Sequence, residues 1–269
     1  DVLRALPAAL RADGGRITAT VGRLHHQNRV LDVEPGFGSL ENLAVAVDIG
    51  TTPAVCALVD LQTGAVLDRD SRYNQQIRLA DDVGSRISLC ADPAMLNELH
   101  RLIVDETLNP LIRNLCRRTG RRIEHVRRVA VAGNTVMGHL FLGISPLSMG
   151  ALPFEPTVRV PGQYRANELG LGINPEGLVD VVPSISAYVG GDLTADIYVS
   201  RLEEHPGLTA LIDIGTNGEI VLHRDGDMWA AATAAGPAFE GAGLAHGCRA
   251  AAGAIESIAI EDGRPVIGT

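Results

Sequence analysis

The sequence has 269 residues, of which 46% are hydrophobic, and a formal net charge of −9. This length and apolar content allow a large buried core and exclude a wholly disordered chain, and the acidic balance argues against nucleic acid as the main partner. All 23 basic residues are arginine. That excludes P-loop, protein-kinase and Schiff-base sites, because each of them needs a lysine from these residues.

Cysteine spacing and hydropathy give further limits. The four cysteines, Cys56, Cys90, Cys116 and Cys248, form no Cys-x-x-Cys pair, so zinc and iron–sulfur ligation find no local support. We expect reduced, mostly buried thiols, as in a cytoplasmic protein. No apolar run approaches the ~20 residues needed to cross a bilayer, and we expect no membrane partner.

The first part of the chain reads as a small leading module. Residues 1–12 predict a short amphipathic helix, and residues 16–23 and 29–33 predict a hairpin or strand pair. The turn-rich segment at residues 34–39 is a plausible boundary, because glycine and proline cluster there.

A three-stranded segment follows. Residues 43–49 form a continuous apolar run that predicts a strand buried on both faces. Residues 54–60 and 65–73 predict the next two strands, joined by a short turn. Asp92 and Pro93 then predict the start of a long helix, in which Pro110 should cause a kink or a break.

The middle of the chain continues with alternating strands and helices. Residues 129–132 and 178–182 predict strands, and Gly133-Asn134-Thr135 opens a helix that reaches residue 142. Residues 145–175 are rich in proline and glycine, and we expect irregular structure there. Gly190-Gly191-Asp192 leads into a further helix that ends near residue 202.

The opening pattern then recurs. Residues 210–216 echo residues 46–51, and two more predicted strands follow at 218–223 and 228–234. A matched string that is followed twice by the same element order favours an internal duplication. Two unrelated Asp-Gly turns are the weaker alternative.

The first of these turns carries the chemistry of a phosphate site. Gly50 has no Cβ, so a phosphate can approach the backbone, and Thr51 and Thr52 offer hydroxyl and N–H donors in place of a lysine. Asp48 would repel phosphate unless a cation lies between them, and a hydrated Mg²⁺ is the natural cation. The second turn repeats these parts, and two facing turns would hold a polyphosphate from both sides. Its residues are Asp213, Gly215, Thr216, Asn217 and Gly218.

Other polar residues have two readings each. Asp192, at a predicted helix start, is either a carboxylate that orients an attacking water or only an N-cap. Asn134 and Thr135, after Gly133, cap a helix and also could lie beside the nucleotide. Gly236 belongs to a glycine turn that we expect to lie near the second of the two Asp-Gly turns.

The combination of segments resembles the actin–hexokinase–heat-shock-chaperone (ASKHA) superfamily of ATPases and sugar kinases, and more narrowly the reductive activators of corrinoid proteins. The resemblance covers the chain from about residue 43 to its end. It rests on Val47–Thr52, Asn74–Ile77 with Asp82–Ile87, Ala132–Thr135, Gly190–Asp192, Ile212–Glu219 and Ala235–Gly241.

The resemblance implies an α/β fold of the duplicated actin-like ATPase (ribonuclease H-like) type, with β-β-β-α-β-α order. Residues 1–38 would form the linker module, residues 39–205 the first ATPase subdomain, and residues 206–269 the start of a second, incomplete one. It also implies a cytoplasmic, ATP-dependent enzyme that returns an inactive corrinoid cobalt to its reduced state. The corrinoid protein of a methyltransferase system would be the partner, and the enzyme is a possible homodimer.

The same resemblance assigns the site residues. ATP and Mg²⁺ are the implied ligands, and a [2Fe-2S] cluster is expected in the full-length protein but not in this chain. The implied catalytic residues are Asp48, Asp192 and Asp213, of which Asp48 and Asp213 would also hold the metal. The implied nucleotide-binding residues are Gly50, Thr51, Thr52, Gly133, Asn134, Thr135, Gly215, Thr216, Asn217, Gly218 and Gly236.

Three departures from that family keep other readings open. The clustered cysteines of an amino-terminal [2Fe-2S] domain are absent from this sequence. In that family the ATPase domain normally continues past the point at which this chain stops, at Thr269, so we interpret the chain as a fragment. Pro53 stands where a third threonine is common, which removes one N–H and one hydroxyl. A small-molecule kinase of the same superfamily, or a nucleotide-gated binding module with little turnover, are the alternatives.

Overall fold

The computed structural model describes residues 2–38, 41–215, 218–233, 253, 255, 257–261 and 263–268. The chain divides into two compact units, Asp1–Ser200 and Arg201–Thr269, and each is described by itself. In the described ranges, no helix is long and apolar enough to cross a membrane.

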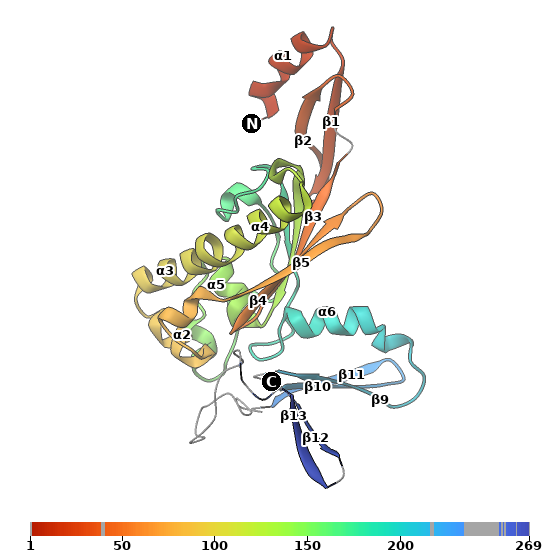
Figure 1. The fold of residues 1–269 in the computed structure, drawn as a ribbon. Coiled ribbons are helices and arrows are strands. Elements are labelled where there is room, and N and C mark those ends of the chain that lie inside the picture. Colours follow the sequence, from red (N-terminus) through yellow and green to blue (C-terminus); the bar gives the residue numbers. More distant parts are fainter. Residues whose placement is uncertain are drawn as a thin grey trace. The chain divides into compact units, whose positions relative to one another are not determined.

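A mixed sheet forms the centre of the first unit (Figure 1). Among the described residues it has six strands in the order β5-β4-β3-β6-β8-β7. The strands β3, β4 and β5 form an antiparallel meander, whereas β6 and β8 run parallel to β3, so that the carboxyl ends of these three strands meet at one edge. The bounds are β3 Leu43–Ile49, β4 Pro53–Asp60, β5 Val66–Tyr73, β6 Val126–Gly133, β7 Gln163–Arg165 and β8 Leu178–Val181.

Helices α3, α4 and α5 pack on one face of this sheet, and the β-β-β-α-β-α order is confirmed (Figure 1). The helices are α2 Val83–Leu89, α3 Pro93–Ile103, α4 Asn109–Thr119, α5 Thr135–Phe141 and α6 Gly191–Ser200. Short 3₁₀ turns occur at Gln75–Arg78, Ile123–His125, Leu147–Gly150, Ala166–Glu168 and, at the start of the second unit, Leu202–Glu204. The predictions from sequence missed α2 and β7.

The long helix begins at the predicted residue, and its regular α-helical geometry is interrupted just before Pro110. Asp92 accepts a hydrogen bond from the Ala94 N–H at 2.8 Å and caps α3. The helix does not end at Pro110, because a π-helical turn, Val104–Leu108, lies between α3 and α4 and places Pro110 in the first turn of α4. Proline is tolerated there, since it has no N–H to donate.

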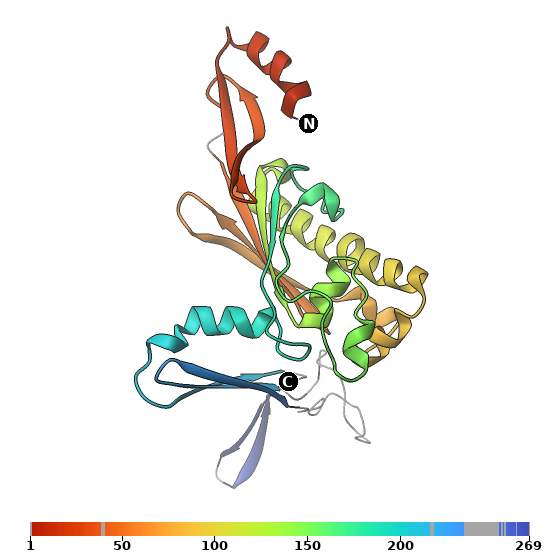
Figure 2. The same cartoon turned by 180° about the vertical axis from the view of Figure 1, so that it is seen from behind.

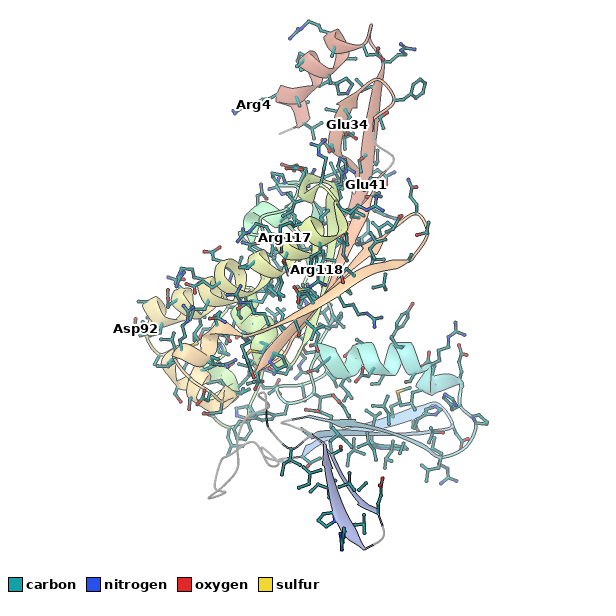
Figure 3. The ribbon with its side chains drawn as sticks, viewed as in Figure 1. Arg4, Glu34, Glu41, Asp92, Arg117 and Arg118 are labelled. Atoms are coloured by element: carbon teal, nitrogen blue, oxygen red, sulfur yellow. The ribbon has the colours of Figure 1, made fainter. Side chains whose placement is uncertain are left out.

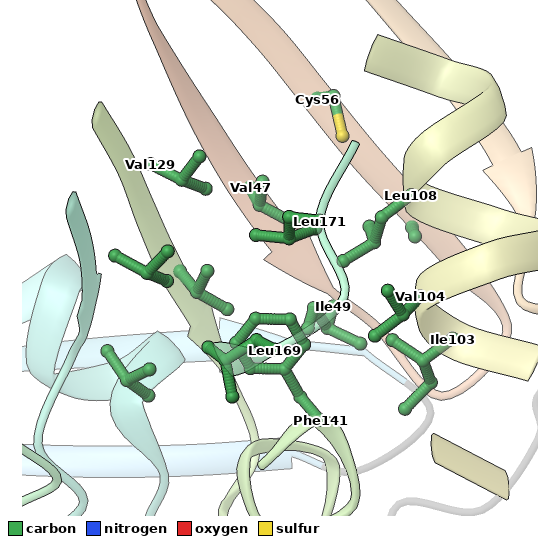
Figure 4. Close-up of a cluster of buried hydrophobic side chains, with 14 of the residues drawn as sticks. Val47, Ile49, Cys56, Ile103, Val104, Leu108, Val129, Phe141, Leu169 and Leu171 are labelled. Carbon is green, nitrogen blue, oxygen red and sulfur yellow. The ribbon is translucent and has the colours of Figure 1, made fainter. Parts of the chain in front are cut away.

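The core lies between the sheet and these helices (Figure 4). On β3, Leu43, Val45, Val47 and Ile49 are buried, while the side chains between them are partly or fully exposed. The prediction that this strand is buried on both faces is therefore wrong. The large side chains alternate with alanine and aspartate, so the two faces of the strand differ in size as well as in polarity.

The leading segment belongs to the first unit. Helix α1, Val2–Ala12, packs beside a hairpin of β1, Ile17–Leu24, and β2, Gln27–Pro35 (Figure 2). The predicted helix and strand pair are confirmed, and β2 is longer than expected. Leu24 and Leu31 of the hairpin pack against Leu178 of β8, which joins the two parts through apolar contact.

An ionic cluster fastens the base of this hairpin to the main sheet. The buried guanidinium of Arg127 donates to the Asp32 carboxylate at 2.7 Å and to the Glu41 carbonyl at 2.8 Å. His125 contacts the Glu41 carboxylate at 2.6 Å. Glu34 and Glu41 are labelled at this base in Figure 3. Because the pairs join elements from different parts of the sequence, they restrict how the hairpin can move.

The second unit repeats the opening meander. Its strands β9, Thr209–Ile214, β10, Gly218–Arg224, and β11, Asp227–Thr233, pair in the order β11-β10-β9. The three predicted strands are confirmed, and both neighbouring pairs are antiparallel, as in β5-β4-β3. A further hairpin, β12 Ser257–Glu261 with β13 Arg264–Gly268, was not predicted from sequence.

One buried histidine ties the irregular region to the core. His139 of α5 contacts the Thr135 carbonyl through Nδ1 at 2.8 Å, and its Nε2 accepts from the Val158 N–H at 3.2 Å. Nε2 can accept only while the imidazole is neutral, and burial lowers the pKa of His139 below its ordinary 6.5.

This histidine predicts a pH effect on stability. In the unfolded chain His139 becomes protonated near pH 6.5, whereas in the folded chain it does so only at lower pH. The contribution of neutral His139 to stability is therefore fully present above pH 6.5 and is lost as the pH falls through the folded pKa. In His139→Gln, the free energy of unfolding by urea should fall less steeply between pH 7 and 5, by up to about 1 kcal/mol per pH unit. His205→Gln, at an exposed position, is the control. An unchanged slope in His139→Gln would contradict the prediction.

Candidate functional site

The candidate site of the first unit lies at the edge where β3, β6 and β8 end. Three segments follow these strands: the turn at residues 50–53, the start of α5 at Asn134, and the Gly190-Gly191-Asp192 segment. Open α/β sheets bind ligands outside the carboxyl ends of their strands, so this is the edge at which a site is expected.

The turn after β3 is tight and depends on its glycine. Ile49 pairs with Ala54, so residues 50–53 connect the two strands. A Cβ on Gly50 would lie 2.3 Å from the Pro53 carbonyl oxygen, which no side chain can do without moving the turn. Asp48 is exposed at the end of β3, on the face opposite the buried side chains. The Asp48 carboxylate thus lies at the rim of the sheet, next to the turn.

The second segment contacts this turn directly. Asn134 Oδ1 accepts from the Met137 N–H at 3.0 Å and caps α5, while its Nδ2 donates to Thr51 Oγ1 at 3.1 Å. Gly133 has a φ of +155°, and a Cβ there would lie 2.7 Å from the Ile49 carbonyl oxygen. The capping role of Asn134 is confirmed, and the same side chain also touches the turn.

Thr135 is placed differently. Its side chain is buried, and its hydroxyl donates to the Ser186 carbonyl at 2.6 Å, so this side chain fastens a loop rather than facing the turn.

The third segment packs on the second. A Cβ on Gly190 would lie 2.5 Å from the Cα of Asn134 and 2.5 Å from Asp192 Oδ1, so only glycine fits at this approach. Asp192 lies within the first turn of α6 rather than before it, and its Oδ1 accepts from the Leu193 N–H at 2.8 Å. These contacts bring the turn, Asn134 and Asp192 to one edge of the first unit.

A buried polar network beneath the turn was not predicted. Asn74, Gln76 and Arg86 are all fully buried. Arg86 Nη2 donates to the Thr51 carbonyl at 2.8 Å, and Asn74 Nδ2 donates to the Gly50 carbonyl at 3.0 Å. Two of the segments behind the family resemblance contain these residues, and the polar side chains in them were the available signal.

Burial sets the charge states around the turn. Desolvation lowers the pKa of Arg86 to about 10, so its guanidinium is still charged at neutral pH. Burial first, then the charges of Asp70 and Asp48, raise the pKa of the Cys56 thiol to about 12. Cys56 is therefore a protonated, inert thiol and not a nucleophile.

The second unit carries the repeated turn only in part. Asp213 lies near the end of β9 and pairs across the sheet with Glu219 of β10, which is buried. Gly215 follows β9, and Gly218 begins β10. The predicted residues Thr216, Asn217 and Gly236 lie outside the described residues.

The donor set fits a nucleotide better than a dedicated metal site. In the part of the chain that the structure describes, no group of three or more His, Cys, Asp or Glu side chains could hold a metal ion. A Mg²⁺ that is bound with a nucleotide needs only one or two carboxylates, since phosphate oxygens and water complete its shell. The glycine turn, the Thr51 hydroxyl and the single carboxylate of Asp48 fit that requirement.

Comparison with known proteins gives concordant matches. Residues 43–205 match the family described as the RACo middle region, and residues 207–267 match the C-terminal domain of RACo, the ASKHA domain. The corrinoid activation enzyme RamQ of Eubacterium limosum is 35% identical over 239 residues, which is 88% of this chain and 40% of that protein. The [Co(II) methylated amine-specific corrinoid protein] reductase of Methanosarcina barkeri is 25% identical over 78% of this chain and 39% of that protein.

A solved structure agrees with these matches. The reductive activator for corrinoid,iron-sulfur protein superposes with a TM-score of 0.88 and 38% identity, over 99% of this chain and 43% of that chain. The chain thus spans about two fifths of the length of these relatives.

The tight turn predicts a stability effect. In Gly50→Ala the new Cβ would meet the Pro53 carbonyl, so the strands must shift, and the free energy of unfolding by urea should fall by about 1–3 kcal/mol. Gly138→Ala in α5 is the matched control, because no atom lies within 4 Å of its added Cβ. That variant should be neutral or up to about 1 kcal/mol more stable. Equal stability of Gly50→Ala and the parent would contradict the geometry.

Proposed function

The chain belongs to the RACo family, with an actin-like ASKHA fold, and we propose that it is the ATP-binding part of an enzyme that reductively activates a corrinoid protein. The names of its relatives, a corrinoid activation enzyme and a corrinoid protein reductase, support the reaction class. The turn at residues 50–53 carries the ATP-binding part of the proposal, because it combines a bare glycine, a positioned threonine hydroxyl and a rim carboxylate.

ATP would bind with its phosphates against this turn. The N–H groups and hydroxyls of Thr51 and Thr52 would donate to phosphate oxygens, in the manner of a backbone anion nest. Gly133, Asn134 and Thr135 would support the site from the neighbouring strand end, since Asn134 already holds the Thr51 hydroxyl. We infer that residues 215–218 and Gly236 contribute to the same nucleotide site, because the second unit repeats the strand order of the first.

Asp48 and Asp213 would hold Mg²⁺ largely through water. The bound cation would neutralise charge on the phosphates. Asp192, at the same edge as the first turn, would orient the water that attacks the terminal phosphate.

Hydrolysis would be coupled to a change in how the protein grips its corrinoid partner. The electron that reduces the inactive cobalt would come from a [2Fe-2S] cluster in a part of the protein outside this chain. We propose a partner from a methyltransferase system, a cytoplasmic location and a possible homodimer. The free, buried thiols of Cys56, Cys90 and Cys116 support the location, since the cytoplasm keeps thiols reduced.

The reaction itself can be tested on the intact protein. With an electron donor and a corrinoid protein whose cobalt is oxidised, the visible spectrum should convert to that of the reduced cobalt only when MgATP is present, with release of phosphate. Conversion at the same rate without ATP would contradict the proposal. Consumption of ATP that requires an added small hydroxyl compound would indicate a kinase instead.

The carboxylate of the second turn gives a residue-level test. In the intact protein, Asp213→Asn should lower Mg²⁺-dependent ATP hydrolysis by about 100-fold, because a neutral amide cannot share in holding the cation. Phosphate release at saturating and limiting MgCl₂ measures this loss.

Asp225→Asn is the matched control. It removes an exposed carboxylate of the same unit at a positive φ that asparagine also adopts, so hydrolysis should be unchanged. Normal hydrolysis by Asp213→Asn would remove the proposed role of this residue.

A further inference from the structure

We infer that Asn74 and Arg86 are positioning residues that hold the carbonyl groups of the β3–β4 turn inward and thereby aim the N–H groups of Thr51 and Thr52 at a bound phosphate. This inference rests on the proposed ATP site and names what gives its first turn its shape.

Three successive carbonyl groups of the turn are held from the interior. Asn74 Nδ2 donates to the Gly50 carbonyl at 3.0 Å, and Arg86 Nη2 donates to the Thr51 carbonyl at 2.8 Å. The backbone N–H of Asn74 donates to the Thr52 carbonyl at 2.7 Å. Both donor side chains are fully buried, so the turn is held by groups that solvent does not reach.

Because peptide groups are planar, the direction of each held carbonyl also fixes the direction of the N–H group that follows it. In a trans peptide the C=O and the following N–H point opposite ways. The N–H of Thr51 therefore points away from Asn74, and the N–H of Thr52 points away from Arg86. The third peptide ends in Pro53 and has no N–H, so holding its carbonyl inward costs the turn no donor.

The hydroxyl of Thr51 is oriented in the same way. Asn134 Oδ1 accepts from a backbone N–H, which fixes Nδ2 as the group that donates to Thr51 Oγ1. Because Oγ1 accepts that bond, the hydroxyl hydrogen is directed elsewhere and is available for a phosphate oxygen. The turn thus offers three aimed donors, two N–H groups and one O–H.

The network is rigid because each member is itself held. Gln76 Oε1 accepts from Arg86 Nη1 at 3.0 Å, and Gln76 Nε2 donates to the Leu99 carbonyl at 2.9 Å. Arg86 Nε donates to the Ala80 carbonyl at 3.1 Å, and Asn74 Oδ1 accepts from the Gln76 N–H at 3.1 Å. Donors fixed in this manner need no reorganisation when an anion binds.

Arg86 also supplies charge. Within the described residues, its hydrogen-bond acceptors are carbonyl oxygens, an amide oxygen and the Met137 sulfur, and no carboxylate forms an ion pair with it. Burial lowers its pKa by more than the charges of Asp82 and Asp81 raise it. A buried cation without a direct anionic partner favours an anion at the turn that it supports. The sequence contains no lysine that could take this part.

The experiment compares phosphate-dependent with phosphate-independent binding in the intact protein. Affinities for ATP and for adenosine are measured by titration calorimetry or competition. In Arg86→Gln and in Asn74→Ala, the affinity for ATP should fall while that for adenosine stays nearly constant. Affinity for ATP should fall on the order of 10- to 100-fold in Arg86→Gln, the loss of one charged hydrogen bond, and roughly 3- to 10-fold in Asn74→Ala, the loss of a neutral one. Affinity for adenosine should stay within about twofold in both, a change worth under ~0.5 kcal/mol. Arg86→Lys keeps the charge and should recover part of the loss. It also serves as the test if Arg86→Gln does not fold.

Arg127→Gln is the matched control, because Arg127 is as buried as Arg86 and belongs to the ionic cluster at the hairpin base. It should lower the free energy of unfolding and leave the ratio of ATP to adenosine affinity unchanged. Equal losses for ATP and adenosine in the Arg86 and Asn74 variants, or no loss for ATP, would overturn the inference and leave the proposed function standing. If the parent protein does not bind ATP, the proposed function fails and the inference fails with it.

Discussion

The shape of one turn constrains the rest of the site in the first unit. Residues 50–53 connect β3 to β4 with the Gly50 Cα against the Pro53 carbonyl, and three carbonyl groups of this turn face inward. A buried carbonyl group is costly unless it is paired. Asn74 and Arg86 meet that requirement, and as a result the N–H groups face the opposite way. The arrangement that satisfies the interior is thus also the one that turns the N–H groups toward the proposed phosphate site.

This dual role explains why a buried arginine is present. Burying a guanidinium without a carboxylate partner costs more than burying an apolar side chain of the same size, so stability alone does not account for Arg86. In the inferred role, Arg86 preorganises the turn, because N–H donors that already point at the phosphate site lose little freedom when a phosphate binds. The neighbouring strand ends extend the same rigidity through the contacts of Asn134 and Gly190.

Local features of the fold and site could be predicted from the sequence. The Asp48 turn, the Asp92 cap and the start of α5 at Asn134 each depend on interactions within a few residues, which the residue types reveal. The contacts of Asn74 and Arg86 with the turn join residues 24 and 35 positions apart, and no spacing rule indicates such pairs. The burial of β3 was mispredicted because alanine counts as apolar although its face of the strand is exposed. The Asp-Ile-Gly-Thr string occurs once in each unit and was the main sequence signal for the family. The two family models match the ranges that contain these strings.

A crystal structure of the intact protein with Mg²⁺ and a non-hydrolysable ATP analogue would test the central claim most directly. The account predicts phosphate oxygens within hydrogen-bond distance, about 2.7–3.2 Å, of the backbone nitrogens of Thr51 and Thr52, with Arg86 still donating to the Thr51 carbonyl. Phosphates bound away from this turn, or a turn whose carbonyl groups point toward the phosphates, would contradict it.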